Sequence, residues 1–333
     1  MAIFRPPPSP RCLKLARVLI TGAAGFVGSH LVDRYLERGD AVVGVDNFIT
    51  GAEQNLASAG RSKEFQFINA DISDNHESVM QLVESSGPCD LVLHFASPAS
   101  PVDYGEHPIE TMAVNSRGTE FCAKLAERWR ARFLYASTSE SYGDPLEHPQ
   151  KESYWGNVNP VGPRSCYDES KRFGEALVMA YFRKKQLDAR IIRIFNTYGP
   201  RMRRNDGRVV PNFVAQAMEG QALTIYGDGK QTRSFCYVDD LVDGIMKCAD
   251  SEDTRGIVVN LGNPEEYTIR EFAEIVCSIV GVPLRIEPRP MPPDDPTRRN
   301  PDISRALKIL GWEPKTSIRD GLARTIEALR VLA

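Results

Sequence analysis

Short apolar runs alternate with stretches of helical periodicity over the first two hundred residues. Runs typical of strands buried on both faces occupy 16–21, 41–46, 65–68, 91–95, 133–136 and 191–195. Helical patterns lie between them, at 29–39, 77–85, 108–128 and 167–185. Strands that alternate with helices predict an α/β fold with a doubly wound parallel sheet, helices on both faces and right-handed connections.

The pattern becomes looser after about residue 199. Shorter elements are expected at 209–220, 223–226, 238–249, 257–261, 269–280 and 303–310. The Pro-rich stretch 288–296 predicts a stiff, extended loop. We therefore expect a loose tail at 1–14, a main domain at 15–200 with return segments near 235–262, and a smaller α/β lobe at 201–333.

Composition narrows the function classes. The chain has 333 residues, enough for roughly two domains. Lys+Arg is 41 and Asp+Glu is 44, a net charge of −3, which argues against nucleic-acid binding. No apolar run is long enough to span a membrane, and we expect no membrane partner. Seven scattered cysteines without a Cys-x-x-Cys pair indicate reduced thiols, a cytoplasmic protein and no metal site.

A glycine-rich turn joins the first strand to the first helix. Gly22, Gly25 and Gly28 follow the run 16–21 directly, where a tight turn lets backbone N–H groups approach a pyrophosphate. Asp46 ends the second strand, where its carboxylate would bind an adenosine ribose and repel a 2′-phosphate. The arrangement predicts a Rossmann-type site for NAD rather than NADP. Asp71 either borders the adenine or caps a helix.

A phenol and an ammonium group lie one helical turn apart, at Tyr167 and Lys171. The lysine favours the phenolate, so the pair can act as a base on a hydroxyl group. The hydroxyls of Ser137, Thr138 and Ser139 end a predicted strand, at the edge of the sheet where a cofactor crevice forms. These residues predict hydride and proton transfer at one site.

The spacing of the glycines resembles that of the short-chain dehydrogenase/reductase superfamily, and longer stretches resemble one family of its extended branch, the UDP-glucuronate decarboxylases (UDP-xylose synthases). The segments Tyr154-Trp-Gly-Asn-Val-Asn-Pro160 and Gln231-Thr-Arg233 are not general motifs of the superfamily. Further similar stretches are 94–101, 136–140, 142–145, 162–169, 193–202, 205–210, 226–230, 260–266 and 311–314. The resemblance covers about residues 16–325.

The resemblance implies decarboxylation of UDP-glucuronate to UDP-xylose through a 4-keto sugar, with NAD regenerated in each turnover. It makes Tyr167 the base at the C4 hydroxyl and Lys171 its partner. Thr138 and Ser139 would bind the reacting oxygen, and Glu140 and Arg299 would lie at the decarboxylation centre. Cofactor contacts are implied for Gly22, Gly25, Phe26, Val27, Gly28, Asp46, Asn47, Phe48, Asp71, Ile72, Ala96, Ser97, Asn115, Ser137, Tyr167 and Lys171. Substrate contacts are implied for Ser100, Asn196, Arg201, Val209, Leu223, Tyr226, Arg233 and Arg299.

Other interpretations remain open for single residues and for the reaction. Glu140 could form a structural ion pair, Arg233 could bridge the lobes, and Asn196 could cap a turn. A UDP-sugar 4-epimerase would use the same tyrosine, lysine and NAD; a 4,6-dehydratase and a non-catalytic nucleotide-sugar sensor are further alternatives. Departures from the family at Ser141, Ser170, Glu110 and Ala113 bear on substrate choice. The family implies a homodimer through a four-helix bundle built from helices near 114–128 and 167–185.

Overall fold

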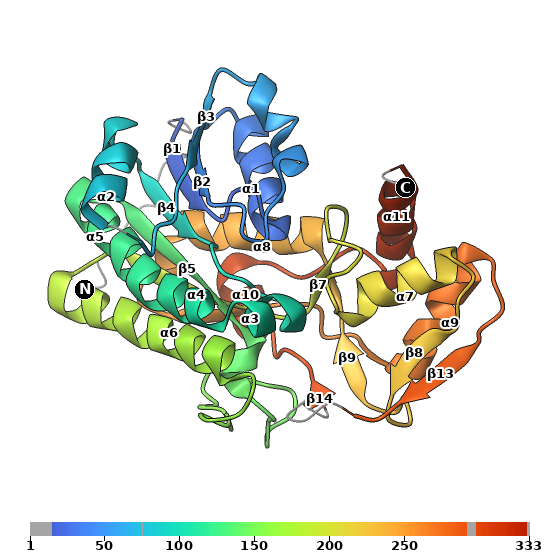
Figure 1. Ribbon diagram of the computed structural model, residues 1–333. Helices are drawn as coiled ribbons and strands as arrows, with labels where there is room; N and C mark the ends of the chain where they lie inside the picture. Colours follow the sequence, from blue (N-terminus) through green and yellow to red (C-terminus); the bar gives the residue numbers. More distant parts are fainter. Residues whose placement is uncertain (1–14, 75, 292–297, 332–333) are drawn as a thin grey trace, which may run out of the picture.

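The computed structural model describes residues 15–74, 76–291 and 298–331 (Figure 1). The expected tail at 1–14 and most of the Pro-rich stretch 288–296 lie outside the described residues. Within them, a large sheet with helices on both sides adjoins a group of smaller C-terminal elements (Figure 1).

The main sheet has seven strands in the order β11-β6-β5-β4-β1-β2-β3, all paired in parallel. The strands are β1 (Arg17–Thr21), β2 (Ala41–Asp46), β3 (Phe65–Asn69), β4 (Leu91–His94), β5 (Arg132–Thr138), β6 (Ala189–Ile194) and β11 (Val258–Leu261). This confirms the predicted doubly wound α/β fold. The edge strand β11 comes from the region predicted to return to the sheet, and it pairs with β6.

Successive residues of β1 point to opposite faces and enter different cores. Val18 and Ile20 pack in a core with α1 (Phe26–Glu37) and α8 (Val238–Asp250). Leu19 packs in the other core. The helices on that second face are α2 (His76–Ser85), α4 (Pro108–Ala113), α5 (Thr119–Trp129) and α6 (Ser165–Lys185). Burial on both faces explains why the predicted strands read as continuous apolar runs.

Two helix predictions need correction. The helix expected at 108–128 is interrupted by a π-helical turn, Val114–Gly118, which separates α4 from α5. The first helix begins at Phe26 rather than residue 29, because Gly25 in extended conformation already caps it. Both differences lie beside the predicted cofactor site, and π turns are frequent at functional sites.

The smaller C-terminal elements lie beyond the carboxyl ends of the strands (Figure 1). The helices there are α3 (Pro101–Glu106) from the first half, and α7 (Val209–Met218), α9 (Ile269–Val280) and α11 (Ile318–Val331). In contrast, α10 (Ser304–Leu310) packs against β11 and α8. The short strands are β7 (Thr197–Tyr198), β8 (Leu223–Tyr226), β9 (Thr232–Ser234), β10 (Cys236–Tyr237), β12 (Glu266–Thr268), β13 (Ile286–Arg289) and β14 (Arg298–Arg299). The sequence did not predict α3, α11 or most of these strands. Residues 288–289, expected in a loop, continue β13 beside β8.

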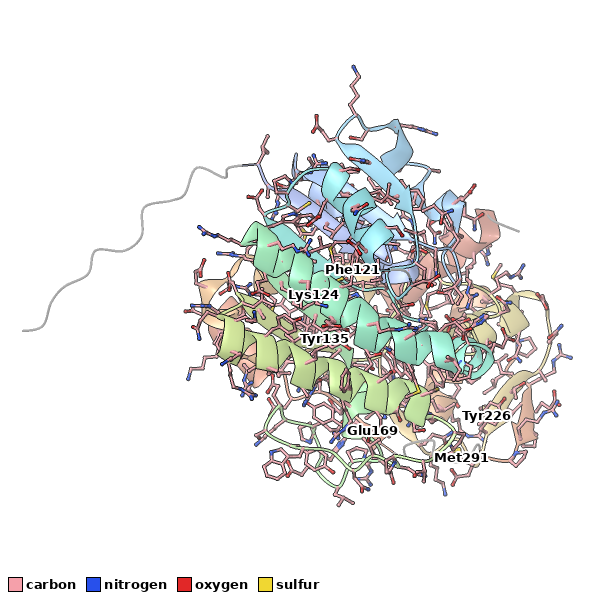
Figure 2. The ribbon with its side chains drawn as sticks, turned by 60° about the vertical axis from the view of Figure 1, so that its left-hand side comes forward. Phe121, Lys124, Tyr135, Glu169, Tyr226 and Met291 are labelled. Atoms are coloured by element: carbon pink, nitrogen blue, oxygen red, sulfur yellow. The ribbon has the colours of Figure 1, made fainter. Side chains whose placement is uncertain are left out.

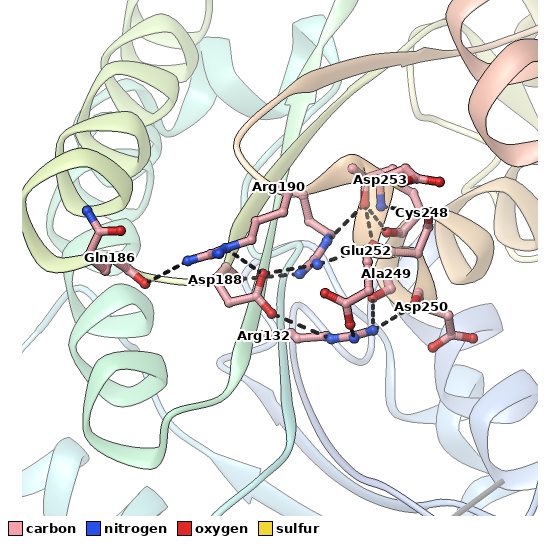
Figure 3. Close-up of polar contacts among 12 residues, drawn as sticks. Arg132, Gln186, Asp188, Arg190, Cys248, Ala249, Asp250, Glu252 and Asp253 are labelled. Atoms are coloured by element: carbon pink, nitrogen blue, oxygen red, sulfur yellow. Dashed lines mark hydrogen bonds and ion pairs between the residues drawn. The ribbon is translucent and has the colours of Figure 1, made fainter. Parts of the chain in front are cut away.

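A polar cluster fastens the end of α8 to the starts of β5 and β6 (Figure 3). The fully buried Arg190 donates to Thr254 Oγ1 at 3.0 Å and to Asp188 Oδ1 at 3.1 Å. Arg132 donates to the carbonyl oxygen of Asp250 at 2.7 Å. Cations at the end of α8 complement its unpaired carbonyl groups. This cluster lies at the amino ends of the strands.

Candidate active site

A cavity of about 690 Å³ opens at the carboxyl ends of the sheet strands. Of the predicted site residues, its walls include Gly22, Gly25, Phe26, Val27, Gly28, Asp46, Asn47, Asp71, Ile72, Ala96, Ser97, Ser100, Ser137, Thr138, Ser139, Glu140, Tyr167, Lys171, Asn196, Arg201, Val209, Tyr226, Arg233 and Arg299. Phe48, Asn115 and Leu223 are absent from its lining. Leu223 is 1% exposed in the apolar core, because alternate residues of β8 face opposite ways and Thr224 and Tyr226 face the cavity instead.

The glycine turn is shaped so that side chains would not fit. Gly22 has φ +72°, and a Cβ built on it would lie 2.7 Å from the Ala96 nitrogen. A Cβ on Gly28 would lie 1.9 Å from the Gly22 oxygen. The turn leads directly into α1, whose first N–H groups have no partner within the helix. The cavity therefore has a ready anion site at this point.

Two acids border the cavity beside the turn. Asp46 is buried and accepts hydrogen bonds from the backbone N–H groups of Ala24 (2.9 Å) and Phe48 (2.8 Å). Burial raises the pKa of Asp46, while these backbone donors act against the rise. Asp71 accepts from Asn47 Nδ2 at 2.9 Å and from the Ser73 N–H at 2.8 Å, so it both caps a turn and reaches the cavity.

Tyr167 and Lys171 lie on the face of α6 that packs on β5, and both are buried. Lys171 Nζ donates to the Ala136 carbonyl at 2.9 Å and lies 5.9 Å from the centroid of the Tyr167 ring. Burial lowers the pKa of Lys171 to about 7, against the opposing charge of Glu175. The sequence predicts that Lys171 lowers the pKa of Tyr167. In the ligand-free protein, burial instead raises the pKa of Tyr167, although the hydrogen bond with the Thr138 hydroxyl opposes the rise.

Glu140 lies between two arginines. It follows β5 in a 3₁₀ turn, Ser139–Tyr142, and accepts from Arg164 Nη2 at 2.5 Å and from Arg299 Nη1. Burial acts to raise the pKa of Glu140, but Arg299 and Arg164 together hold it below the usual value. Glu140 therefore forms an ion pair, as one interpretation of the sequence predicts, and all three side chains also line the cavity.

The substrate-side residues come from the C-terminal elements. Arg299 on β14 is paired in parallel register with Arg233 on β9, which brings two buried guanidinium groups together. Arg201 Nη2 donates to Asp33 Oδ2 of α1 at 2.5 Å, an ion pair that fixes its side chain. The backbone oxygen of Asn196 accepts from the Cys236 N–H at 2.9 Å. Arg233 and Arg299 thus contribute two cations to the part of the cavity wall that the C-terminal elements form.

Comparison with known proteins assigns the family. A family model described as GDP-mannose 4,6 dehydratase matches residues 19–325. UDP-glucuronic acid decarboxylase 1 of Arabidopsis thaliana is 50% identical over 317 residues, which cover 95% of this chain and 70% of the relative. UDP-glucuronic acid decarboxylase 1 of Danio rerio is 49% identical over 311 residues, covering 93% and 72%. The chain belongs to the UDP-glucuronic acid decarboxylase family.

Solved structures of related enzymes have the same fold as this decarboxylase-family chain. The UDP-glucuronic acid 4-epimerase of Bacillus cereus, in complex with UDP-glucuronic acid and NAD, aligns with a TM-score of 0.85 and 29% identity, covering 95% of this chain and 100% of the epimerase. The dTDP-glucose 4,6-dehydratase DesIV of Streptomyces venezuelae, with NAD and TYD bound, aligns with a TM-score of 0.84 and 28% identity, covering 95% and 97%. Identity to the decarboxylases is therefore much higher.

Some wall residues of this family member were not identified from the sequence. The ring of Tyr104 stacks on Tyr167, with centroids 5.1 Å apart and planes 10° apart, and its buried hydroxyl has no hydrogen-bond partner among the residues that the structure describes. Arg164 lay inside a matching stretch, but nothing indicated its contact with Glu140. Arg208 also lines the cavity, and its Nη2 donates to Asp206 Oδ2 at 2.7 Å.

The departures from the decarboxylase pattern fall in two places. Glu110 lines the cavity, whereas Ala113 is absent from its lining. Ser170 Oγ accepts from Asn115 Nδ2 at 3.0 Å, and Asn115 Nδ2 also donates to Ser97 Oγ at 3.1 Å. Ser141 Oγ lies 3.2 Å from Ser137 Oγ. The two serines therefore join hydrogen-bond networks behind the cavity wall.

Metal and membrane features can be assessed over the described parts of the chain. No cluster of three or more His, Cys, Asp or Glu side chains there could hold a metal ion. Likewise, none of the helices described is both long enough and apolar enough to cross a membrane.

Proposed function

We propose that this chain is an NAD-dependent UDP-glucuronate decarboxylase, which converts UDP-glucuronate and a proton to UDP-xylose and CO₂. The observation that carries the proposal is a single cavity that holds the glycine turn, the Tyr167–Lys171 pair and the Glu140–Arg299 pair. The identity of about half of all positions to UDP-glucuronic acid decarboxylases supports it.

The residues present fit NAD. The glycine turn has no space for side chains, and α1 directs unpaired N–H groups at a pyrophosphate. Asp46 accepts two backbone hydrogen bonds, which leaves carboxylate lone pairs for a ribose. The chemistry that NAD supplies when bound is reversible hydride transfer. We propose Asp46 as the residue that selects against a 2′-phosphate, with the other cavity-lining members of the predicted cofactor set around it.

At the sugar, we propose that Tyr167 removes the C4 hydroxyl proton and later returns it. Lys171 supplies a positive charge that favours the phenolate, which burial alone disfavours. Thr138 and Ser139 are buried at the end of β5 and would hold the C4 oxygen. These groups orient the hydroxyl for oxidation.

Oxidation at C4 makes the carboxyl group of the sugar a β-keto acid. Its C–C bond breaks to release CO₂, the electron pair passes into the C4 ketone as an enolate, and C5 then gains a proton. We propose that Glu140 and Arg299 face this centre. There they would stabilise the charge that develops and assist the transfer of a proton to C5. Arg164 keeps Glu140 in place from the other side.

We propose that the nucleotide lies across the second lobe. Arg233, Asn196 and Arg201 would bind the diphosphate, and the backbone of β8 would hold the uracil beside Tyr226. Ser100 and Val209 would complete the sugar and nucleotide contacts. This corresponds to a cofactor domain at 15–200 and a substrate lobe mainly at 201–333.

We also propose a homodimer through a four-helix bundle of α4–α5 and α6. Figure 2 shows α5 and α6 side by side along one face, with Lys124 and Glu169 labelled. Ile109, Met112 and Phe173 on these helices are exposed although apolar. Light scattering on the purified protein tests the dimer. A cytoplasmic location is proposed from the free cysteines found among the described residues.

The experiment is incubation with UDP-glucuronate, followed by measurement of CO₂ and of the nucleotide-sugar product. UDP-xylose with stoichiometric CO₂ is expected. UDP-galacturonate without CO₂ would instead show the 4-epimerase alternative, the activity named for the Bacillus cereus structure. Because glucuronate has no C6 hydroxyl to lose, the 4,6-dehydratase alternative is tested in parallel with UDP-glucose, from which loss of water to a 4-keto-6-deoxy sugar would indicate it. Binding without turnover of either substrate would indicate a sensor.

A further inference from the structure

Glu175 lies on the same face of α6 as the two proposed catalytic residues. It follows Lys171 by one helical turn and Tyr167 by two. Its side chain is only 12% exposed, and it accepts a hydrogen bond from Ser137 Oγ at 2.5 Å. A carboxylate this deeply buried requires paired groups around it.

Arg193 provides that pairing from the neighbouring strand β6. Its Nε donates to Glu175 Oε1 at 2.8 Å and its Nη2 to Oε2 at 2.7 Å, a bidentate arrangement. The guanidinium group also lies 4.6 Å from the ring centroid of Tyr142. The position of the Glu175 carboxylate is therefore fixed on two sides.

The two α6 side chains hold adjacent residues of β5. Lys171 donates to the Ala136 carbonyl at 2.9 Å, and Glu175 accepts from the Ser137 hydroxyl. Gly174 lies between them, and a Cβ there would be 2.1 Å from the Tyr135 hydroxyl, so helix and strand are in close contact. Figure 2 shows Tyr135 labelled near the two helices that cover it. These contacts set the register of α6 on β5.

We propose that Glu175, clamped by Arg193, is a positioning residue that fixes the Ser137 hydroxyl and places a negative charge beside Lys171. The inference rests on the proposed function, because it takes the Lys171 ammonium as the group that assists Tyr167. Burial lowers the pKa of Lys171 to about 7, and the charge of Glu175 opposes this fall. The carboxylate thus favours the charged form of Lys171 against the effect of burial.

The other titratable groups around Lys171 do not replace this charge. The ring centroid of Tyr135 on β5 lies 5.3 Å from Lys171 Nζ, and burial raises the pKa of Tyr135. His94 on β4 is neutral at neutral pH because burial, then Lys171, lowers its pKa to about 3. Burial likewise raises the pKa of Tyr167 on α6 itself. Arg193, on β6, faces Glu175 and is paired with it.

The test is the titration of Lys171 in the ligand-free protein. The rate of carbamylation of Lys171 by cyanate, measured by peptide mass spectrometry against pH, gives the midpoint for the neutral amine. Glu175→Gln should move this midpoint down by about one pH unit or more. The matched control is Glu169→Gln, which removes a carboxylate from the same helix at a side chain that is 37% exposed, and should leave the midpoint unchanged. An unchanged midpoint in Glu175→Gln overturns the proposal.

A second variant guards against misfolding. Glu175→Gln leaves the Arg193 cation buried without its partner, which destabilises a fold. The double variant Glu175→Gln/Arg193→Met removes the ion pair as a unit, so its midpoint should lie between those of Glu175→Gln and the unmodified protein. A midpoint at or above that of the unmodified protein would contradict the proposal. As the pH is raised, the rate of CO₂ release should begin to fall at a lower pH in both variants than in the unmodified protein. If the unmodified protein releases no CO₂, the proposed function fails, while the titration still decides the role of Glu175.

Discussion

Glu140 and Arg299 form an ion pair inside the cavity although 159 residues separate them in the chain. The second guanidinium nitrogen of Arg299 donates to the Gly143 carbonyl at 3.1 Å, which anchors the arginine to the turn that carries Glu140. The C-terminal strand β14 is thus attached directly to the end of β5. A site for charge rearrangement gains from such fixed groups, because they need not reorganise during the reaction.

Glu140→Gln should lower the rate of CO₂ release by about 10²-fold or more, the size expected for loss of a general acid–base group. The variant keeps the size of the side chain and removes the charge that faces Arg164 and Arg299. Stopped-flow measurement of the reduced cofactor should show that oxidation at C4 is much less affected. CO₂ release at the unmodified rate would remove Glu140 from the proposed chemistry.

Arg299→Lys should also impair decarboxylation, because an ammonium group cannot contact Glu140 and the Gly143 carbonyl in the same fork geometry. Combined with Glu140→Gln, the two effects should not add, since the residues act as one pair. Steady-state kinetics of both single variants and the double variant measure this coupling. Strict additivity would indicate two independent roles.

Tyr167→Phe should abolish turnover, with a loss of about 10³-fold, because the phenol oxygen is the proposed base. The ring should keep its stack on Tyr104, so the fold and NAD affinity should change little. Fluorescence quenching by NADH measures the affinity separately from the reaction. Turnover near the unmodified rate in the phenylalanine variant would overturn the mechanism.

Lys171 should make the stability of the ligand-free protein depend on pH. Its pKa is lowered to about 7 in the fold, whereas an unfolded chain has a lysine pKa of about 10.4. Between these values the unfolded state binds the extra proton, so the free energy of unfolding should rise with pH across this window, by a few kcal/mol. Below pH 7 both states are protonated and the cost of burying the charge is complete. Urea titrations at several pH values should show the rise, and Lys171→Met should lack it.

The polar cluster around Arg190 allows a stability test away from the cavity. Arg190→Met removes hydrogen bonds to Thr254 and Asp188 and should lower the free energy of unfolding by about 2 kcal/mol. Asp188 retains ion pairs with Arg132 and Arg255 at 3.6 Å. Arg255→Met, at a side chain that is 44% exposed, is the control and should change stability by less than about 1 kcal/mol. A change of KM for UDP-glucuronate in either variant would contradict a purely structural role.

The sequence predicted best those features that are local along the chain. The β1 run and the Gly22–Gly28 turn carry their own signals, since burial on both faces and a backbone free of side chains restrict residue types at neighbouring positions. Contacts between distant residues leave no such pattern. Nothing at Tyr104 indicated that its ring would stack on Tyr167, and nothing at Arg164 indicated a carboxylate 2.5 Å away. The π turn at Val114–Gly118 keeps helical periodicity on both sides and was therefore read as one helix.

The pairing of β14 with β9 has a consequence for what a shortened chain would contain. The glycine turn, Asp46 and the Tyr167–Lys171 pair all precede residue 200, and α8 and β11, which complete one face and one edge of the main sheet, also precede Arg299 in the chain. Arg299 lies on β14, one of the last elements of the chain, and reaches Glu140 from a strand that is paired with β9. A chain that ends before Arg299 thus contains the seven-stranded sheet and the residues proposed to bind the dinucleotide, but it lacks the arginine proposed to assist CO₂ release.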